Sequence, residues 1–307
     1  MRLSFILPVY NESATLREFF LEVRAAAQNL AEEREFIFIN DGSRDGSLAV
    51  MKSLRTEVGP GEIFRILDFS RNFGQQAAVT AGVEHATGDA IILMDTDMQD
   101  DPAAFAEFVR VWKAGHDVVY AVRSSRRESV VMRFLFRSFY RILGSLSNVE
   151  IPMDAGNFGL ISRRVADEIR GLPEHNRYFP GLRAWVGFPR AGVDVPRRSR
   201  GDGPSRLGFS GLFRLAVDGL LAFSDAPLRL AFLAAFILSF LAVAGVVVIV
   251  GIKLFTDKAV VMWASIMCSV LFIGAMQFFL IGLLGEYIGR IYSEVKRRPH
   301  YIVREVL

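Results

Sequence analysis

Short apolar runs alternate with longer stretches of mixed polarity through the first part of the chain. The apolar runs are residues 3–9, 35–40, 64–68, 90–94 and 117–122. They predict buried strands, and the stretches between them predict helices, with Ser13 or Thr15 as a cap for the first and residues 45–47 just before the second. This alternation predicts a layered α/β fold with a largely parallel sheet.

The pattern changes near the C-terminus, where two apolar runs are much longer. Residues 230–252 and 259–285 contain no charged side chain, and Gln277 is their strongly polar exception. Each run exceeds the roughly 20 residues that a bilayer-spanning helix needs. We therefore expect a transmembrane hairpin over residues 227–289, with spans at about 228–252 and 259–285. A buried helical hairpin in a soluble protein is the alternative.

Basic residues flank the predicted spans unevenly. Arg290, Arg304 and the basic run 296–298 follow the second span, whereas Lys253 and Lys258 lie between the two. Basic flanks of short segments tend to stay in the cytoplasm, so we expect an integral protein of the inner (plasma) membrane with both termini cytoplasmic. The opening apolar run is too short and too poorly flanked for a signal peptide.

Composition narrows the classes of function. The 307 residues are 51% hydrophobic with a net charge of +3, which suits a nearby anionic lipid surface. No nucleic-acid-binding motif is found, so we expect no nucleic-acid partner. Cys268 is the only cysteine, which excludes a disulfide framework and a cysteine-based zinc cluster. Glycine-rich phosphate loops of the dinucleotide and Walker types are absent, which argues against an NAD enzyme and a P-loop ATPase.

Polar side chains follow the predicted strands where each strand ends. These segments are Pro8-Val-Tyr10-Asn-Glu12, Asn40-Asp41-Gly-Ser, Ser70-Arg71-Asn and Asp95-Thr-Asp97-Met-Gln99. Each alone is typical of a turn, a helix cap or a surface charge. Because the carboxyl ends of parallel strands meet at one edge of a sheet, together they predict a site there. Two carboxylates one residue apart are hard oxygen ligands that suit Mg²⁺ or Mn²⁺.

Several ordered motifs resemble one known family. They are Pro-Val-Tyr-Asn-Glu, Asn-Asp-Gly-Ser-x-Asp-Gly, Ser-Arg-Asn-Phe-Gly, Asp-Thr-Asp-Met-Gln-Asp and Gly-Glu-Tyr-Ile-Gly-Arg-Ile-Tyr-Ser-Glu-Val-Lys-Arg-Arg-Pro. With the two long apolar runs, the chain resembles glycosyltransferase family 2, and more narrowly the bacterial polyprenyl-phosphate glycosyltransferases related to dolichol-phosphate mannose synthase. The resemblance extends over essentially the whole chain. It implies a GT-A, Rossmann-like nucleotide-sugar-binding domain, which we expect at residues 1–207, and a C-terminal tail at 290–307.

The resemblance also assigns roles at the strand ends. It implies that the nucleotide sugar is bound by Pro8, Tyr10, Glu12, Asp41, Arg71 and Asp95. It implies that Asp95 and Asp97 are catalytic and hold a divalent cation, Mg²⁺ or Mn²⁺, together with Gln99. Such a cation neutralises the charge that develops on a departing nucleoside diphosphate.

Arginines are the residues to expect against a lipid phosphate. The resemblance implies acceptor-phosphate arginines at Arg123 and Arg126, and we add Arg133, Arg200 and Arg206. Arg133 lies in the segment 130–143, which predicts a basic amphipathic helix in the headgroup layer or, alternatively, a domain helix with a solvated basic face. The segment 196–206 either closes over the site or is a flexible charged linker. Apolar spacing over 208–226 predicts an interfacial helix.

One position departs from the pattern of many relatives. They carry an aspartate near the acceptor where this chain has Asn157, and Asp154 is a candidate to supply the missing carboxylate. A phosphate monoester is already anionic at neutral pH. It can attack the anomeric carbon without a protein base, so positioning matters more than proton transfer.

These features predict inverting transfer of one sugar from a nucleoside-diphosphate sugar to polyprenyl phosphate at the cytoplasmic face of the membrane. UDP-glucose and undecaprenyl phosphate are our first choices. GDP-mannose and 4-amino-4-deoxyarabinose donors are alternatives, because the motifs do not read the sugar. A catalytically inactive, membrane-tethered sugar-nucleotide-binding protein and a processive polysaccharide synthase are alternatives from other classes. Glycines in the spans would permit a homo-oligomer.

The substitution Asp97→Asn is expected to lower the rate of sugar transfer by about a hundredfold or more. It removes a negative charge that holds the metal ion, and the metal ion in turn neutralises the diphosphate. Folding should change far less, since the two side chains have nearly the same shape. Transfer rates and thermal unfolding curves of the two proteins check this. Equal transfer by both would contradict the assignment.

Overall fold

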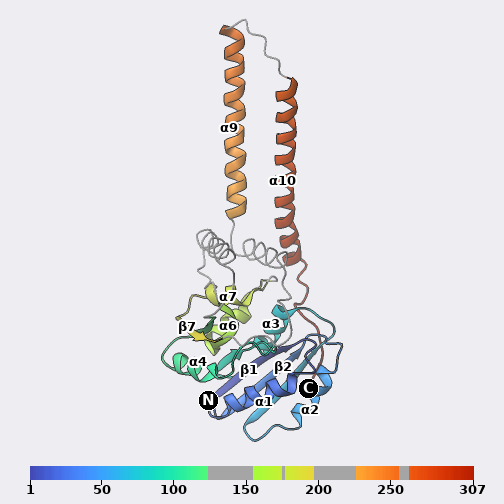
Figure 1. The fold of residues 1–307 in the computed structure, drawn as a ribbon, viewed down its shortest axis with the longest axis vertical. Helices are drawn as coiled ribbons and strands as arrows, with labels where there is room; N and C mark the ends of the chain where they lie inside the picture. Colours follow the sequence, from blue (N-terminus) through green and yellow to red (C-terminus); the bar gives the residue numbers. More distant parts are fainter. Residues whose placement is uncertain (124–154, 175–176, 197–225, 256–262) are drawn as a thin grey trace. The chain divides into compact units, whose positions relative to one another are not determined.

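The computed structural model describes residues 1–123, 155–174, 177–196, 226–255 and 263–307. The chain divides into two compact units, and each is treated by itself. The first contains the sheet together with residues 298–307, and the second contains two long helices (Figure 1). The predicted amphipathic helix at 130–143 lies outside the described residues, as does nearly all of the predicted interfacial segment 208–226.

The first unit is built on an eight-stranded sheet with the order β7-β5-β6-β4-β1-β2-β3-β8. Its strands are β1 (Arg2–Val9), β2 (Glu33–Asn40), β3 (Glu62–Phe69), β4 (Ala90–Leu93), β5 (Val118–Arg123), β6 (Ala155–Ser162), β7 (Arg190–Val195) and β8 (Val303–Val306). The α/β class and the strands expected at β1 to β5 are confirmed. The sheet is mixed, because β6 runs antiparallel to both β4 and β5, and β8 runs antiparallel to β3.

Helices cover both faces of this sheet. They are α1 (Leu16–Ala27), α2 (Ser47–Arg55), α3 (Gln75–His85), α4 (Ala104–Lys113), α6 (Arg163–Gly171) and α7 (Phe179–Trp185). Side chains of α1, α2 and α4 pack with one face of the sheet, and side chains of α3, α6 and α7 pack with the other. Alternate residues of the buried strands point to opposite faces, which explains why β1 and β2 read as continuous apolar runs.

Neither of the first two helices has a capping hydrogen bond from the side chain of its N-cap residue, Thr15 for α1 and Gly46 for α2. Asp45 instead accepts hydrogen bonds from the N–H and the hydroxyl of Ser47, at 3.0 and 2.6 Å, where α2 begins. The sequence therefore located both helix starts, while the capping contact at α1 is absent among the described residues.

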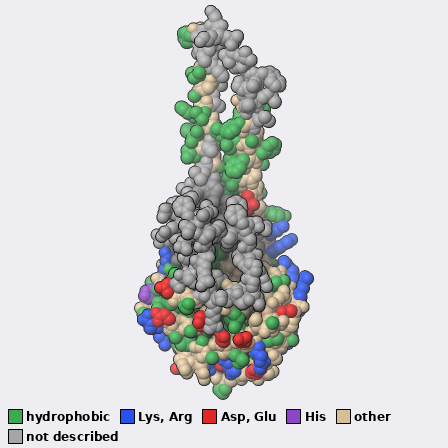
Figure 2. Space-filling model, viewed as in Figure 1, with side chains coloured by type: hydrophobic (Ala, Val, Ile, Leu, Met, Phe, Trp, Pro, Cys, Tyr) green, Lys and Arg blue, Asp and Glu red, His purple; other side chains and the backbone are tan. Residues whose placement is uncertain are grey.

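The second unit contains α9 (Ala226–Phe255) and α10 (Trp263–Val295). Helices thus occur where both spans were predicted, and α10 continues past the predicted end at residue 285. Apolar side chains such as Phe232, Phe240 and Phe278 are largely exposed along them (Figure 2). Within the part of the chain that the structure describes, one segment, Phe272–Val295, is long and apolar enough to cross a membrane.

The last residues of the chain return to the sheet, although the sequence indicated only a tail at 290–307. Strand β8 pairs with β3, and the Ser70 N–H donates to the carbonyl oxygen of Ile302 at 2.9 Å. Arg304 Nη2 donates to the carbonyl oxygen of Ser70 at 3.0 Å, and its Nη1 lies 3.4 Å from Asp68 Oδ2. The C-terminal strand therefore holds the point where β3 ends and the following loop begins.

Replacing Arg304 by alanine should lower the melting temperature by about 2–4 °C, because contacts to the Ser70 carbonyl and to a buried carboxylate are lost. Lys52→Ala is the matched control, since Lys52 pairs with Glu305 of the same strand at 3.7 Å on the exposed surface. Thermal unfolding of the full chain in detergent measures both. Equal effects of the two substitutions would show that β8 does not depend on Arg304.

Candidate functional site

The loops that follow β1 and β2 are joined by hydrogen bonds at the carboxyl edge of the sheet. The Asn11 N–H donates to Ser43 Oγ at 3.1 Å, and the Arg44 N–H donates to Asn11 Oδ1 at 2.9 Å. The Glu12 N–H donates to Ser47 Oγ at 3.0 Å. Asn11 has φ 55, a left-handed conformation that asparagine tolerates better than most residues. These contacts fix the backbone beside Tyr10, a residue that is 44% exposed.

Asp41 fixes the loop that follows β3. This residue is 4% exposed, and its two carboxylate oxygens accept from the N–H groups of Phe73 and Gly74 at 2.7 and 3.0 Å. Burial raises the pKa of the Asp41 carboxyl above its ordinary value, against the effect of these hydrogen bonds. A Cβ at Gly42 would lie 2.4 Å from the carbonyl carbon of Arg71, so only glycine lets the two loops approach.

Arg71 itself is exposed, and its guanidinium lies 4.1 Å from the centroid of the Phe73 ring. Arg71 therefore lies in the loop system that also contains Tyr10, Glu12 and Asp41. The visible role of Asp41 is to hold this loop. Its direct contact with a nucleotide stays a prediction.

The paired acids lie directly after β4, partly buried and each held by an amide. Gln75, the first residue of α3, donates to Asp95 Oδ1 at 2.7 Å. Gln99 donates its backbone N–H to Asp97 Oδ1 at 3.2 Å and its side-chain amide to Asp97 Oδ2 at 2.6 Å. The Thr96 hydroxyl between them donates to the carbonyl oxygen of Pro8 at 2.8 Å, which ties this segment to the end of β1.

These donors suit a divalent cation. The carboxylates of Asp95 and Asp97 and the amide oxygen of Gln99 are hard oxygen ligands of the kind that Mg²⁺ and Mn²⁺ take, usually completed by water and substrate phosphate. Among the described residues, no cluster of three or more His, Cys, Asp or Glu side chains is placed to hold a metal.

Asn157 lies on the other side of β4, in the neighbouring strand β6. Gly159 of β6 is opposite Leu93 of β4. Asn157 lies two residues from Gly159 in β6 and shares its face, which is the face of Leu93. Asp95 lies two residues past the end of β4, and it accepts a hydrogen bond from Gln75 of α3, the helix that covers this face. The side chain of Asn157 is 8% exposed, and an amide supplies neither a charge nor a general base.

Two contributors were missed by the sequence analysis. Gln75 holds Asp95, and Arg183 of α7 is a buried arginine whose Nη2 donates to the carbonyl oxygen of Gly156, next to Asn157, at 3.1 Å. A usable signal for Arg183 was its isolation as a charge in the otherwise apolar segment Phe179–Trp185. Gln75 gave none, because a glutamine at the start of a helix is usually solvated.

The predicted acceptor side falls largely outside the described residues. Arg126, Arg133, Asp154, Arg200 and Arg206 all lie there. Arg123 is the last residue of β5, and its side chain is not described.

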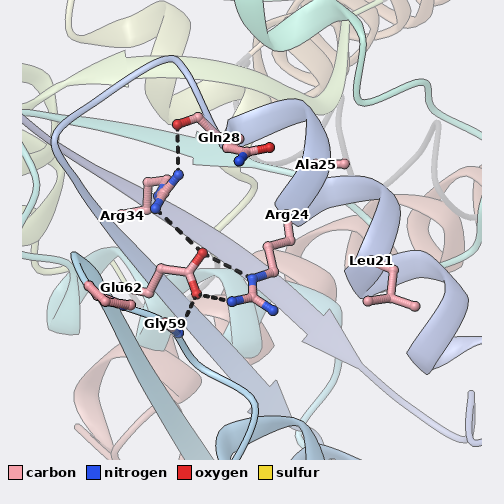
Figure 3. A pocket seen from close by; sticks show the side chains of 8 residues that line it. Leu21, Arg24, Ala25, Gln28, Arg34, Gly59 and Glu62 are labelled. Carbon is pink, nitrogen blue, oxygen red and sulfur yellow. Dashed lines mark hydrogen bonds and ion pairs between the residues drawn. The ribbon is translucent and has the colours of Figure 1, made fainter.

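A pocket of about 350 Å³ lies away from these carboxylates, near the amino ends of β2 and β3 (Figure 3). Two ion pairs line this pocket: Arg24 Nη2 lies 2.7 Å and Arg34 Nη2 lies 3.5 Å from the Glu62 carboxylate. They connect helix α1, which contains Arg24, to the first residues of β2 and β3. Their geometry is that of a structural cluster at the edge opposite the predicted site.

Comparisons with known proteins identify the family of this chain. The chain matches the family described as glycosyl transferase family 2 over residues 4–170 and the GtrB C-terminal hairpin over residues 226–291. It is 37% identical over 303 residues to the uncharacterized glycosyltransferase YkcC of Bacillus subtilis, covering 98% of this chain and 93% of that one. It is 36% identical over 307 residues to the bactoprenol glucosyl transferase of Shigella phage SfII, covering 99% and 98%.

A solved structure supports the fold. Glucosyl-3-phosphoglycerate synthase from Mycobacterium tuberculosis, solved with Mn²⁺, UDP-glucose and phosphoglyceric acid, superposes with a TM-score of 0.50 at 17% identity. The match covers 72% of this chain and 79% of that one, and the shared architecture is the GT-A fold. The chain therefore belongs to glycosyltransferase family 2 and is a glycosyltransferase with a GtrB-type C-terminal hairpin.

Proposed function

We propose that this glycosyltransferase moves one sugar, with inversion, from a nucleoside-diphosphate sugar to polyprenyl phosphate at the cytoplasmic face of the membrane. UDP-glucose is the proposed donor and undecaprenyl phosphate the proposed acceptor. One observation carries the proposal: Asp95 and Asp97 lie at the same sheet edge as the loops after β1, β2 and β3. The near full-length similarity to proteins named bactoprenol glucosyl transferases supports the acceptor class and favours glucose.

The donor half of the site is the loop system on the β1, β2 and β3 side of the acids. Tyr10 offers an exposed ring, Glu12 a carboxylate and Arg71 a cation to the base, ribose and phosphates. Pro8 contributes the end of β1, and Asp41 keeps the loop at Phe73 and Gly74 in place. A preformed loop system loses little conformational entropy when it binds a nucleotide.

A divalent cation, Mg²⁺ or Mn²⁺, held by Asp95, Asp97 and Gln99 would neutralise the charge that develops on the departing diphosphate. The residues behind it set the orientation of these ligands. Gln75 donates to Asp95, and the backbone N–H of Gln99 donates to Asp97. Such supporting hydrogen bonds commonly change metal affinity by about 10- to 100-fold.

The reaction needs no protein base. An oxygen of the acceptor phosphate forms a bond to the anomeric carbon while the bond from that carbon to the diphosphate breaks, and the nucleoside diphosphate leaves with the electron pair. The attacking oxygen is already deprotonated at neutral pH. An amide at position 157 is compatible with this chemistry, because no proton has to be taken from the attacking oxygen.

The acceptor is a lipid, so the site must be reached from a membrane. The exposed apolar surface of α9 and α10 is unsuited to water, and we propose that both helices span the bilayer. We further propose that segments 130–143 and 208–226 lie in the headgroup layer. Arg123, Arg126, Arg133, Arg200 and Arg206 would then contact phosphates, with Asp154 nearby.

The purified protein with Mn²⁺ or Mg²⁺, undecaprenyl phosphate and a panel of radiolabelled nucleotide sugars should yield a labelled lipid, with UDP-glucose the best donor. Chelation by EDTA should abolish the product, and added Mn²⁺ should restore it. If only GDP-mannose gave a product, the proposed donor would be wrong and the proposed type of reaction would stand. No lipid product from any donor would refute the proposed function.

Gln75→Ala should raise the Mn²⁺ concentration needed for half-maximal transfer by about tenfold, because Asp95 loses its hydrogen-bond donor. At saturating Mn²⁺ most of the activity should return. Gln28→Ala, in the pocket at the opposite edge, is the matched control. An unchanged Mn²⁺ dependence in Gln75→Ala would separate this glutamine from the metal site.

A further inference from the structure

Arg183 is a buried cation that has no counter-ion among the described residues. The residue is 3% exposed, and Nη2 donates to the carbonyl oxygen of Gly156 at 3.1 Å, while Nη1 has no hydrogen-bond partner in the described part of the chain. The guanidinium also lies over the rings of Tyr120 and Phe179, 5.5 and 5.8 Å from their centroids. In the part of the chain that the structure describes, no carboxylate pairs with this arginine.

Such an arrangement costs free energy. Burial lowers the pKa of the Arg183 guanidinium to about 10, so the group is still protonated at neutral pH. A buried arginine that serves only the fold normally has a carboxylate partner, as Arg34 has in Glu62 at 3.5 Å. A charge kept without one indicates a group that is compensated when a ligand binds.

The fold brings the Arg183 guanidinium to the first residues of β6, the strand next to β4. A Cβ at Gly159 would lie 3.2 Å from Arg183 Nη1 and 2.3 Å from the carbonyl oxygen of Val119, so glycine allows α7 to approach β6. Asn157, on the same face, lies between Gly159 and the carbonyl of Gly156 that Arg183 binds.

Helix α3 joins the two sides. Its residue Gln76 accepts a hydrogen bond from the N–H of Phe179, the first residue of α7, at 2.9 Å. The preceding residue, Gln75, donates to Asp95. One helix start therefore holds both the metal-site carboxylate and the helix that carries Arg183.

The order of the strands indicates which substrate group Arg183 meets. The loops proposed to hold the nucleotide follow β1, β2 and β3, on one side of β4, whereas β6 and β5 beneath Arg183 lie on the other side. A diphosphate at Asp95 and Asp97 therefore has the sugar and then the acceptor on the Arg183 side. A neutral hexose gives no counter-charge, so the acceptor phosphate is the next anion in this order.

The geometry points to Arg183 as a binding residue for the phosphate of the acceptor lipid, through Nη1 beside Asn157. This inference rests on the proposed function for the identity of the acceptor. Because Nη1 is buried in the structure, the phosphate reaches it only after local rearrangement of the surrounding side chains, as happens in many sites that close on a substrate.

The test compares Arg183→Leu, Arg183→Lys and the matched control Arg34→Leu in the full chain in detergent. Arg183→Leu should raise the KM for polyprenyl phosphate by about tenfold or more and leave the donor KM nearly unchanged, and lysine should restore part of the loss. Its melting temperature should equal or exceed that of the unsubstituted protein, because an uncompensated buried charge is removed. Arg34→Leu should lower the melting temperature and leave the acceptor KM unchanged. A melting temperature of Arg183→Leu lowered as in the control, with an unchanged acceptor KM, would make Arg183 structural and overturn the inference.

A binding measurement separates this inference from the proposed function. Farnesyl phosphate should raise the melting temperature of the unsubstituted protein and not that of Arg183→Leu, whereas UDP with Mn²⁺ should stabilise both. This result would support the inference even if the transfer assay gave no lipid product. Loss of the UDP–Mn²⁺ effect in Arg183→Leu, with the farnesyl phosphate effect kept, would assign the arginine to the donor and overturn it.

Discussion

Two carboxylates held one residue apart at the end of a buried strand are the constraint around which this site is organised. Gln75 and Gln99 come from two different segments, and each donates a hydrogen bond to one of the two acids, Asp95 and Asp97. The Thr96 hydroxyl fixes the segment to β1, so the acids stay at the edge where the nucleotide loops end.

Buried charges elsewhere in the first unit follow two different designs. Arg34 and Glu62 compensate each other and join the starts of neighbouring strands to α1. Asp41 and Arg183 form no ion pair of this kind among the described residues: backbone N–H groups hold Asp41, and Arg183 contacts one carbonyl and two rings. Asp41 directly follows β2, and Arg183 lies in α7 with its guanidinium against the first residues of β6. Sites that bind charged substrates commonly keep such costly groups, and the surrounding core supplies the stability.

The C-terminus gives the fold an unexpected closure. After two long apolar helices the chain returns to pair with β3, and Arg304 contacts the carbonyl of Ser70 where the donor-side loop begins. Tyr301 stacks on Phe69 with ring centroids 5.0 Å apart and donates to Glu84 of α3. Residues after the hairpin therefore stabilise a loop that lies far before it in sequence: Arg304 contacts Ser70, which is 234 positions away.

The sequence by itself determined the central strands, the helices between them and the two long C-terminal helices. It could do so because these elements have their own apolar periodicity, which is a local property. It also determined that Tyr10, Asp41, Arg71 and the paired acids meet at one edge, since parallel strands end together. The sequence did not determine the contacts of each side chain. Asp41, for example, accepts a hydrogen bond from the N–H of Phe73 in the loop after β3, and this contact depends on which loop the fold brings next to it.

Only the tertiary structure decided the mixed order of the sheet, the return of residues 303–306 to β3 and the position of Arg183. Strand β8 is four residues long and its burial pattern is mostly exposed, so it carries no periodic signal of its own and exists through its partner. Arg183 is one charge in a short helix, and its burial follows from Gly159 and Tyr120, which lie far from it in sequence. Contacts between segments that are distant along the chain leave no local pattern in the sequence. The partners of a buried charge come from such contacts, so the sequence alone does not reveal them.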